Sequence, residues 1–285
     1  MTRGLTRRAT AGWLTASLAG GPAVAAPPPR RIVSTNPCLD AILVQVADRA
    51  QIAAISHLSR DPSTSSIGAL GQTLPFTYGS AEEIVALRPD LVLIGRYGSP
   101  STLAALARLG VRAELFGAPD TVADSLAQVK QVAEAVGRPE RGRALAHRIQ
   151  AALAAAAPPP GTPRLTALTY QSGGFATAPG TMMDEVMRRA GLDNAASRYG
   201  LRRTGDVPLE RLIADPPDVL LAGEVEPGAP TWADRVLSHP ALAHLAHRMH
   251  RASFPRRLTY CGGPVLIETA AVLARIRREA LEARG

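Results

Sequence analysis

Hydrophobic and polar positions follow two different patterns along this chain. Short, continuously apolar runs such as Leu91–Ile94 and Val219–Leu221 are separated by longer segments in which apolar residues recur every three or four positions. Runs of the first kind are typical of strands buried on both faces of a parallel sheet, and segments of the second kind of the helices that cover it. The pattern therefore predicts an α/β fold.

Residues 139–157 form the longest predicted helix. The segment begins with Pro139 at a first-turn position, is rich in alanine, and ends at a run of three prolines, which cannot continue a helix. At about 1.5 Å per residue it would span roughly 28 Å. Taken alone, it is either a strut between two lobes or a long surface helix of one larger domain.

A repeated unit favours two lobes. Residues 81–95 align without a gap on residues 209–223, each copy being a short helix, a Pro-Asp pair and an apolar strand. One such unit is common in α/β proteins, but two copies on either side of a long helix indicate similar halves. We therefore predict an N-terminal lobe of residues 26–138, a connecting helix of residues 139–157, and a C-terminal lobe of residues 158–285.

The charge of the chain does not indicate a nucleic-acid partner. The formal net charge is +8, but Lys130 is the only lysine and the arginines are spread without a basic run. A binding surface for phosphates would concentrate them on one element. With 46% hydrophobic and 20% charged residues, the composition is that of an ordinary soluble globular protein.

Residues 1–25 have the pattern of a secretory signal peptide. Three arginines among the first eight residues precede a short apolar stretch, and Ala23-Val-Ala25 supplies a small-x-small cleavage pattern. The apolar stretch is too short to span a bilayer. Because no cysteine lies near the cleavage point, we expect a periplasmic protein without a lipid anchor; the sequence leaves the export route open between general and twin-arginine secretion.

The candidate binding residues lie in loops that leave the predicted strands, because ligands of open parallel sheets bind at the carboxyl ends of strands. Aromatic and arginine side chains dominate these loops, although only 4% of the chain is aromatic. They suit a cleft that grips a flat or anionic organic ligand, and the alternative for each residue is an ordinary loop role. The candidates are Asn36, Cys38, His57, Arg60, Phe76, Tyr78, Arg96, Tyr97, Gln171, Phe175, Arg257, Tyr260 and Cys261.

Enzymatic and metal-binding motifs are absent from the sequence. There is no Gly-x-Ser-x-Gly elbow, phosphate-binding loop or His-Glu-x-x-His motif. The histidines between positions 239 and 250 have no acidic or cysteine neighbour suited to a metal site. We therefore expect no catalytic residue, resident metal or cofactor. The alternative is an exported two-lobed hydrolytic enzyme, with Ser59 or Cys38 activated by His57, or a ligand sensor that uses the same cleft.

The two cysteines allow three interpretations. Cys38 and Cys261 both follow predicted strands and are expected to face the same cleft, although they lie near opposite ends of the chain. An even number of cysteines in an exported protein favours a disulfide, which would tie the lobes together. The thiols would otherwise be free and buried, or would contact the ligand.

Three segments resemble landmarks of a known family, in the order in which the family has them. Residues 31–34, 82–93 and 207–213 resemble those of the periplasmic substrate-binding proteins of ABC importers for iron–siderophore, heme and cobalamin. The resemblance covers about residues 30–283. It implies two Rossmann-like lobes joined by one long helix, a ligand captured between them, and delivery of that ligand to a permease. Because the linker is a helix, we expect the lobes to move little.

The resemblance also implies a docking role for one exposed carboxylate per lobe. These fall on Glu82 and Glu210, the two glutamates that the internal repeat pairs, and would enter arginine pockets on the permease. The alternative is that each complements the dipole of its own helix. Family members that bind bare zinc or manganese use three histidines and a carboxylate, and His57 alone is available in the first lobe. We therefore expect a monomer that binds an iron complex (siderophore or heme) or a corrinoid.

Overall fold

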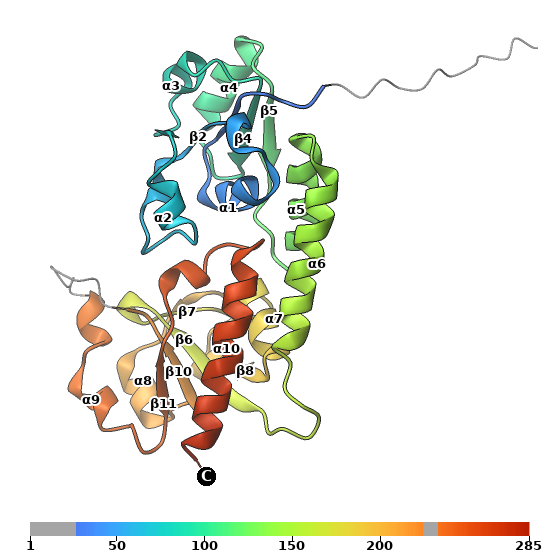
Figure 1. The fold of residues 1–285 in the computed structure, drawn as a ribbon. Helices are drawn as coiled ribbons and strands as arrows, with labels where there is room; N and C mark the ends of the chain where they lie inside the picture. Colours follow the sequence, from blue (N-terminus) through green and yellow to red (C-terminus); the bar gives the residue numbers. More distant parts are fainter. Residues whose placement is uncertain (1–26, 225–232, 285) are drawn as a thin grey trace, which may run out of the picture.

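The computed structural model describes residues 27–224 and 233–284. The predicted signal peptide, residues 1–25, lies outside this part of the chain. Figure 1 shows two lobes stacked end to end and joined along one side by helices α5 (Val122–Ala135) and α6 (Pro139–Ala155). Within the described residues, no helix combines the length and the apolar character needed to cross a membrane.

The N-terminal lobe contains a five-stranded parallel sheet in the order β3-β2-β1-β4-β5. Every residue of the central strands β1 and β4 is buried, as their apolar composition predicts. The strands are β1 (Ile32–Ser34), β2 (Ile52–Ser56), β3 (Phe76–Thr77), β4 (Leu91–Gly95) and β5 (Ala113–Phe116). The other helices of this lobe are α1 (Pro37–Val46), η1 (Arg49–Gln51), η2 (His57–Arg60), α2 (Gly68–Gly71), α3 (Ala81–Ala86) and α4 (Pro100–Arg108).

The C-terminal lobe repeats this architecture with one strand fewer in its main sheet. Its main sheet is parallel, in the order β11-β10-β6-β8, and a short antiparallel pair, β7-β9, lies beside it. The strands are β6 (Leu165–Tyr170), β7 (Phe175–Ala176), β8 (Leu192–Asn194), β9 (Gly205–Asp206), β10 (Val219–Ala222) and β11 (His250–Ser253). The helices are η3 (Ser172–Gly174), α7 (Met182–Arg189), η4 (Ala195–Tyr199), α8 (Leu209–Ala214), η5 (Ala233–Val236), α9 (Pro240–Ala243), η6 (Arg256–Leu258) and α10 (Val265–Glu282).

Helix α6 is anchored in both lobes. At its start, Arg138 and Arg141 form ion pairs with Asp48, which follows α1 in the N-terminal lobe. At its end, the Ala156 carbonyl accepts a hydrogen bond of 3.2 Å from Arg277 of α10 in the C-terminal lobe. The connection is therefore a helix held at each end by a different lobe, and the fold class predicted from the sequence is confirmed.

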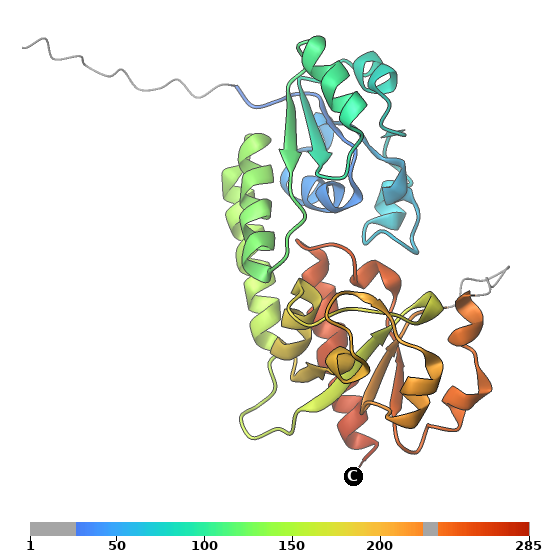
Figure 2. The same ribbon diagram turned by 180° about the vertical axis from the view of Figure 1, so that it is seen from behind.

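The connection is not a bare strut, because one hydrophobic core runs through it. Helices α5 and α6 lie side by side along the edge of the molecule, as the view from behind also shows (Figure 2). The buried side chains of α6 belong to a single cluster that includes residues of both lobes, among them Ile42, Val129, Met183 and Leu273. Separating the lobes would expose apolar surface of this cluster to water, at roughly 25 cal/mol per Å².

Candidate functional site

The loops that follow β1 and β2 lie at the end of the N-terminal lobe that is turned towards the C-terminal lobe (Figure 1). These loops carry α1, η2 and α2. The strands are parallel, so the segments that leave their carboxyl ends gather at one edge of the sheet. Most of the residues that the sequence marks as candidate ligand contacts in the N-terminal lobe belong to this edge.

Four side chains form a stacked group here, which we call the N-lobe aromatic cluster: His57, Arg60, Phe76 and Tyr78. The His57 and Tyr78 rings lie 4.8 Å apart, and the Phe76 ring meets Tyr78 edge-on at 5.6 Å. The Arg60 guanidinium lies over the Phe76 ring, 4.3 Å from its centre. Tyr78 nevertheless remains 68% exposed. The cluster therefore offers aromatic surface and a cation together, as a flat anionic ligand requires.

Glu83 holds the loop that carries Tyr78. Its carboxylate accepts hydrogen bonds of 2.7 Å from the Thr77 hydroxyl and from the Tyr78 backbone N–H. These bonds hold the pKa of Glu83 below its usual value, because they favour the charged form. Ser80 caps the same helix by accepting from the Glu83 N–H at 3.2 Å. Ser80 thus caps the helix, while the Glu83 carboxylate fixes the backbone of the exposed tyrosine.

Two buried polar atoms in the cluster have no hydrogen-bond partner among the described residues. They are Nδ1 of His57 and Nε of Arg60. A buried polar atom without a partner costs about 1–3 kcal/mol. The turn His57–Arg60 is therefore held in a conformation that its own hydrogen bonds do not fully stabilise.

The C-terminal lobe presents a second set of side chains around η6. The Arg256 guanidinium lies 5.0 Å from the centre of the Tyr260 ring and donates a hydrogen bond to its hydroxyl. Arg257 instead forms a bidentate ion pair with Glu268, with both N···O distances at 2.6 Å, and this pairing raises the pKa of Arg257. Arg257 was a predicted ligand contact, but its charge is already matched within the lobe; Arg256 is the more exposed of the two cations.

The pKa of Asp61 depends on groups from both lobes. Partial burial raises the pKa of this carboxyl, but hydrogen bonds from Ser63 and Thr64 and the positive charge of Arg256 together hold it below its usual value. Asp61 directly follows the turn of the N-lobe aromatic cluster, whereas Arg256 belongs to the C-terminal lobe. The candidate binding loops of the two lobes therefore lie close enough to influence each other's charge.

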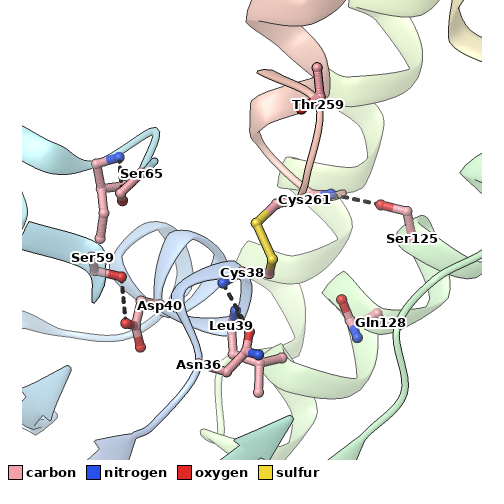
Figure 3. Close-up of a disulfide and its surroundings, with 12 residues drawn as sticks. Asn36, Cys38, Leu39, Asp40, Ser59, Ser65, Ser125, Gln128, Thr259 and Cys261 are labelled. Carbon is pink, nitrogen blue, oxygen red and sulfur yellow. Dashed lines mark hydrogen bonds between the residues drawn. A yellow bond between two sulfur atoms is a disulfide. The ribbon is translucent and has the colours of Figure 1, made fainter. Parts of the chain in front are cut away.

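Cys38 and Cys261 form a disulfide, with 5.2 Å between their Cα atoms (Figure 3). The bond joins the first turn of α1 to the loop between η6 and α10, and so connects the two lobes directly. Of the three interpretations that the sequence allows, the structure contains the disulfide. The prediction that Cys38 and Cys261 contact the ligand as thiols is therefore wrong, because a disulfide sulfur carries no thiolate to bind a ligand or metal.

Two other predicted contacts have structural partners. The side-chain oxygen of Asn36 caps α1 by accepting from the Cys38 and Leu39 N–H groups, at 2.9 and 3.2 Å. Gln171 is buried, and its amide donates to the Phe254 carbonyl at 3.3 Å. Both side chains therefore stabilise backbone segments that lead into the candidate site. Position after a strand marks such residues but cannot separate support from contact.

The remaining predicted contacts are exposed aromatic or charged residues. Tyr97 follows β4 and is 86% exposed, next to Arg96, which is also exposed. Phe175, in β7, is exposed as well. The described residues contain no group of three or more His, Cys, Asp or Glu side chains placed to hold a metal ion. Of the histidines near position 244, His239 caps α9 through a hydrogen bond of 3.2 Å from the Ala241 N–H.

Sequence reasoning missed one buried polar residue, Asp40. It lies on α1, is fully buried, and accepts hydrogen bonds from the Ser59 hydroxyl at 2.6 Å and from the Ser56 N–H at 2.9 Å (Figure 3). Burial raises the pKa of its carboxyl to about 7. The signal was visible, because a carboxylate interrupts the apolar face of α1 between Leu39 and Ile42. A charged residue on such a face needs partners.

The predicted docking glutamates occupy equivalent places in the two lobes. Glu82 lies in the first turn of α3 and Glu210 in the first turn of α8, and both are exposed. A carboxylate at this position complements the helix dipole, so the geometry fits the alternative reading as well.

Comparison with known proteins places the fold. The chain is similar to the periplasmic heme-binding protein RhuT from Roseiflexus sp. RS-1 in its apo form, with 25% identity, a TM-score of 0.69 and coverage of 90% of this chain and 99% of that one. It also resembles a periplasmic heme-binding protein from Pseudomonas aeruginosa, with 24% identity, a TM-score of 0.66 and coverage of 86% and 91%. The periplasmic vitamin B12-binding protein BtuF of Vibrio cholerae is 18% identical, with a TM-score of 0.62 and coverage of 90% and 99%.

The family is shown by the sequence match itself. A search of curated proteins finds no match. The family model described as periplasmic binding protein, however, matches residues 32–246, which include most of both lobes and all of α6. The chain therefore belongs to the periplasmic binding protein family and serves as a solute-capturing component of an ABC importer.

Proposed function

We propose that the solute is heme, bound between the N-lobe aromatic cluster and the loop around η6. The observation that carries the proposal is the cluster itself, in which aromatic rings and the Arg60 cation are stacked on the side of the lobe that faces the other lobe. A porphyrin is flat and apolar and carries two carboxylates. It therefore matches exposed rings flanked by arginines. The likeness to RhuT, at 25% identity, supports the same ligand class.

Tyr78 and His57 are the residues suited to the iron of this cargo. Phenolate and imidazole are both established protein ligands of heme iron. The Tyr78 hydroxyl has no hydrogen-bond partner among the described residues and its side chain is mostly exposed. The His57 ring lies against the Tyr78 ring at 4.8 Å. Arg60 and Arg256, which present cations on the two lobes, would pair with the carboxylates.

The experiment is a titration of the purified protein with hemin, followed by absorption in the Soret region and by native mass spectrometry. We expect a 1:1 complex whose affinity falls most in the Tyr78→Phe and His57→Ala variants. Tyr97→Phe is the comparison variant, because Tyr97 is another exposed candidate tyrosine but has no ring partner among the described residues. Cobalamin and a ferric siderophore serve as competing probes. Saturable binding of one of these without hemin binding would replace heme by that ligand.

We further propose that the protein acts as a monomer in the periplasm and docks on its permease through Glu82 and Glu210. The support is their exposure and their equivalent positions in the internal repeat. Uptake of the ligand should fail when both are changed to lysine, while ligand affinity stays unchanged. Glu282→Lys, an exposed charge reversal at the end of α10, is the control. Equal uptake by all three proteins would exclude this docking surface.

The hydrolytic alternative loses its named nucleophiles. Ser59 is fully buried and its hydroxyl donates to Asp40, while Cys38 is part of the disulfide. Neither side chain is therefore available to attack a substrate with His57 as its base. A ligand sensor would use the same binding surface as a carrier, and the uptake experiment above separates these two roles.

A further inference from the structure

The first turn of α1 contacts the candidate binding loops of both lobes. Two of its residues point in different directions (Figure 3). Cys38 is bonded to Cys261, which ends the segment that carries Arg256 and Tyr260. Asp40, two positions later, accepts hydrogen bonds from Ser56 and Ser59, which lie on either side of His57 and Leu58. One helical turn thus touches the segments that supply the ligand-facing side chains of each lobe.

Asp40 costs stability where it stands. Its side chain is completely buried, and Oδ1 has no hydrogen-bond partner among the described residues. The groups that face it from β1, β2 and η2 are the hydroxyl of Ser34, the N–H of Ser56 and the hydroxyl of Ser59, none of which is a cation. An apolar side chain of similar size would avoid the cost of burying this carboxyl. The residue therefore needs a role beyond filling the core.

The hydrogen bonds of Asp40 determine the shape of the turn His57–Arg60. Ser56 is the N-cap of η2 and Ser59 lies within it, so the carboxylate holds the turn at two points. The turn also packs against α2 from the other side. A Cβ atom at Gly71 would come within 2.2 Å of the Ser59 carbonyl oxygen. With Asp40 on one side and α2 on the other, the backbone that carries His57 and Arg60 is held from both sides.

On its other side, α1 packs closely against the loop that contains Cys261 and Gly263. The Gly263 N–H donates to the Ser125 hydroxyl of α5 at 2.7 Å, in a buried position. Gly263 has a positive φ of 70°, and a Cβ atom there would lie 2.9 Å from a side-chain carbon of Ile42 on α1. Only glycine combines this backbone conformation with so close an approach. The loop that carries Cys261 is therefore held against α1 and α5 by backbone contacts as well as by the disulfide.

We propose that the first turn of α1 is the positioning element of the ligand site, with Asp40 as the positioning residue of the turn His57–Arg60 and the Cys38–Cys261 bond as its counterpart for the loop around η6. This inference rests on the proposed function for the identity of the binding loops. It adds that the spacing of the two ligand-facing surfaces is set by α1 and does not depend on the ligand. Loss of either attachment releases one surface.

The test compares Asp40→Ala, Asp40→Asn and the double variant Cys38→Ser/Cys261→Ser. Asp184→Asn is the matched control, because Asp184 is also buried, lies in the first turn of a helix and accepts a hydrogen bond of 2.9 Å from the Gly180 N–H. That carboxyl belongs to the C-terminal lobe. Ser59→Ala removes the same contact from the other side, and serves if Asp40→Ala does not fold.

The first readout is amide hydrogen exchange of residues 56–61 in the ligand-free protein. We expect Asp40→Ala to speed exchange there by about tenfold, because the substitution removes one to two buried hydrogen bonds that hold the turn closed. Asp40→Asn, which keeps an acceptor oxygen, should restore part of the protection. The disulfide variant should instead speed exchange in residues 256–263. Asp184→Asn should change neither segment, although it lowers the melting temperature.

The second readout is hemin affinity, arranged as a double-mutant cycle. Asp40→Ala and the disulfide variant should each weaken binding by about tenfold. Their combination should weaken it by less than the product, because the ligand needs both surfaces held at once and loses less from the second once the first is released. Unchanged exchange in residues 56–61 of Asp40→Ala and Ser59→Ala would overturn the proposal. So would multiplicative losses of affinity. If the wild-type protein does not bind hemin, the proposed function fails, and the exchange experiment alone still decides the positioning role.

Discussion

Each lobe has an aspartate that directly precedes a central strand and accepts backbone hydrogen bonds from a neighbouring segment. In the N-terminal lobe, Asp90 accepts hydrogen bonds of 2.7 and 2.9 Å from the Arg30 and Arg31 N–H groups, next to β1. In the C-terminal lobe, Asp218 accepts from the Thr166 N–H at 2.6 Å, at the start of β6. These aspartates belong to the repeated Pro-Asp pair. The repeat that is visible in the sequence therefore encodes how adjacent parallel strands are fixed at their amino ends.

The opposite ends of the two sheets differ. The N-terminal lobe ends in the aromatic cluster, where Arg60 lies over a ring and two buried polar atoms lack partners. The C-terminal lobe ends in the loop around η6, where Arg257 is paired with Glu268. The repeated part thus fixes the scaffold, while the loops that would contact the ligand are not repeated. Ligand selectivity should accordingly depend more on the N-terminal lobe.

The largest expected effect on stability is that of removing the disulfide that connects the lobes. The Cys38–Cys261 bond spans 223 positions of the chain, and removing a bond that closes a loop of this size should lower the free energy of unfolding by about 3–5 kcal/mol. Urea denaturation of Cys38→Ser/Cys261→Ser, against the wild-type protein with and without a reducing agent, measures it. A reduced wild-type protein as stable as the oxidised one would mean that the shared core alone joins the lobes.

The next effect is the pH dependence that Asp40 gives to the N-terminal lobe. Its pKa is raised from 3.8 to about 7, so the folded protein binds a proton that the unfolded chain has released. The free energy of unfolding should therefore fall as the pH rises from about 4 to about 7, by at most about 4 kcal/mol for a shift of roughly three units. Asp40→Asn should flatten this fall. Denaturant titrations at pH 5 and pH 8 measure how much the free energy of unfolding changes with pH in each protein. Equal changes in the two proteins would contradict the prediction.

The comparison of the two aspartates is tested by Asp90→Asn and Asp218→Asn. Asp218 also accepts from the Thr166 hydroxyl at 2.8 Å and pairs with Arg284. We expect its substitution to cost about 1–3 kcal/mol at neutral pH and that of Asp90 less. Although partial burial raises the pKa of Asp218, hydrogen bonds from Arg284 and Thr166 lower it overall. Its stabilisation is thus present at neutral pH and lost as the pH falls below its usual pKa, which thermal unfolding at pH 7 and pH 3 would detect.

The smallest effect should come from making the C-terminal surface more like the N-terminal one. Glu268→Gln removes the partner of Arg257, whose side chain is 25% exposed. An ion pair at this depth contributes about 0.5–1 kcal/mol, so stability should change little. The freed cation should instead tighten hemin binding severalfold, measured at two salt concentrations. Weaker binding would indicate that the pair orients Arg257 for the ligand.

The sequence predicts the scaffold better than the site, for physical reasons. Apolar runs and the proline at the start of α6 are local signals, and they identify the elements and the two lobes. The roles of Gln171 and Arg257 depend on Phe254 and Glu268, which local patterns do not bring together. The burial of Asp40 and the pairing of the cysteines likewise follow from the packing of α1 against other segments.

The disulfide also orders events during the life of the chain. Cys38 is made well before Cys261, and the sequence contains no other cysteine. An incomplete chain that stops before residue 261 therefore cannot close the bond, and a complete one has no wrong partner within itself. The bond forms only when α1 and the loop before α10 have come together. Its oxidation state thus records whether these two segments have assembled.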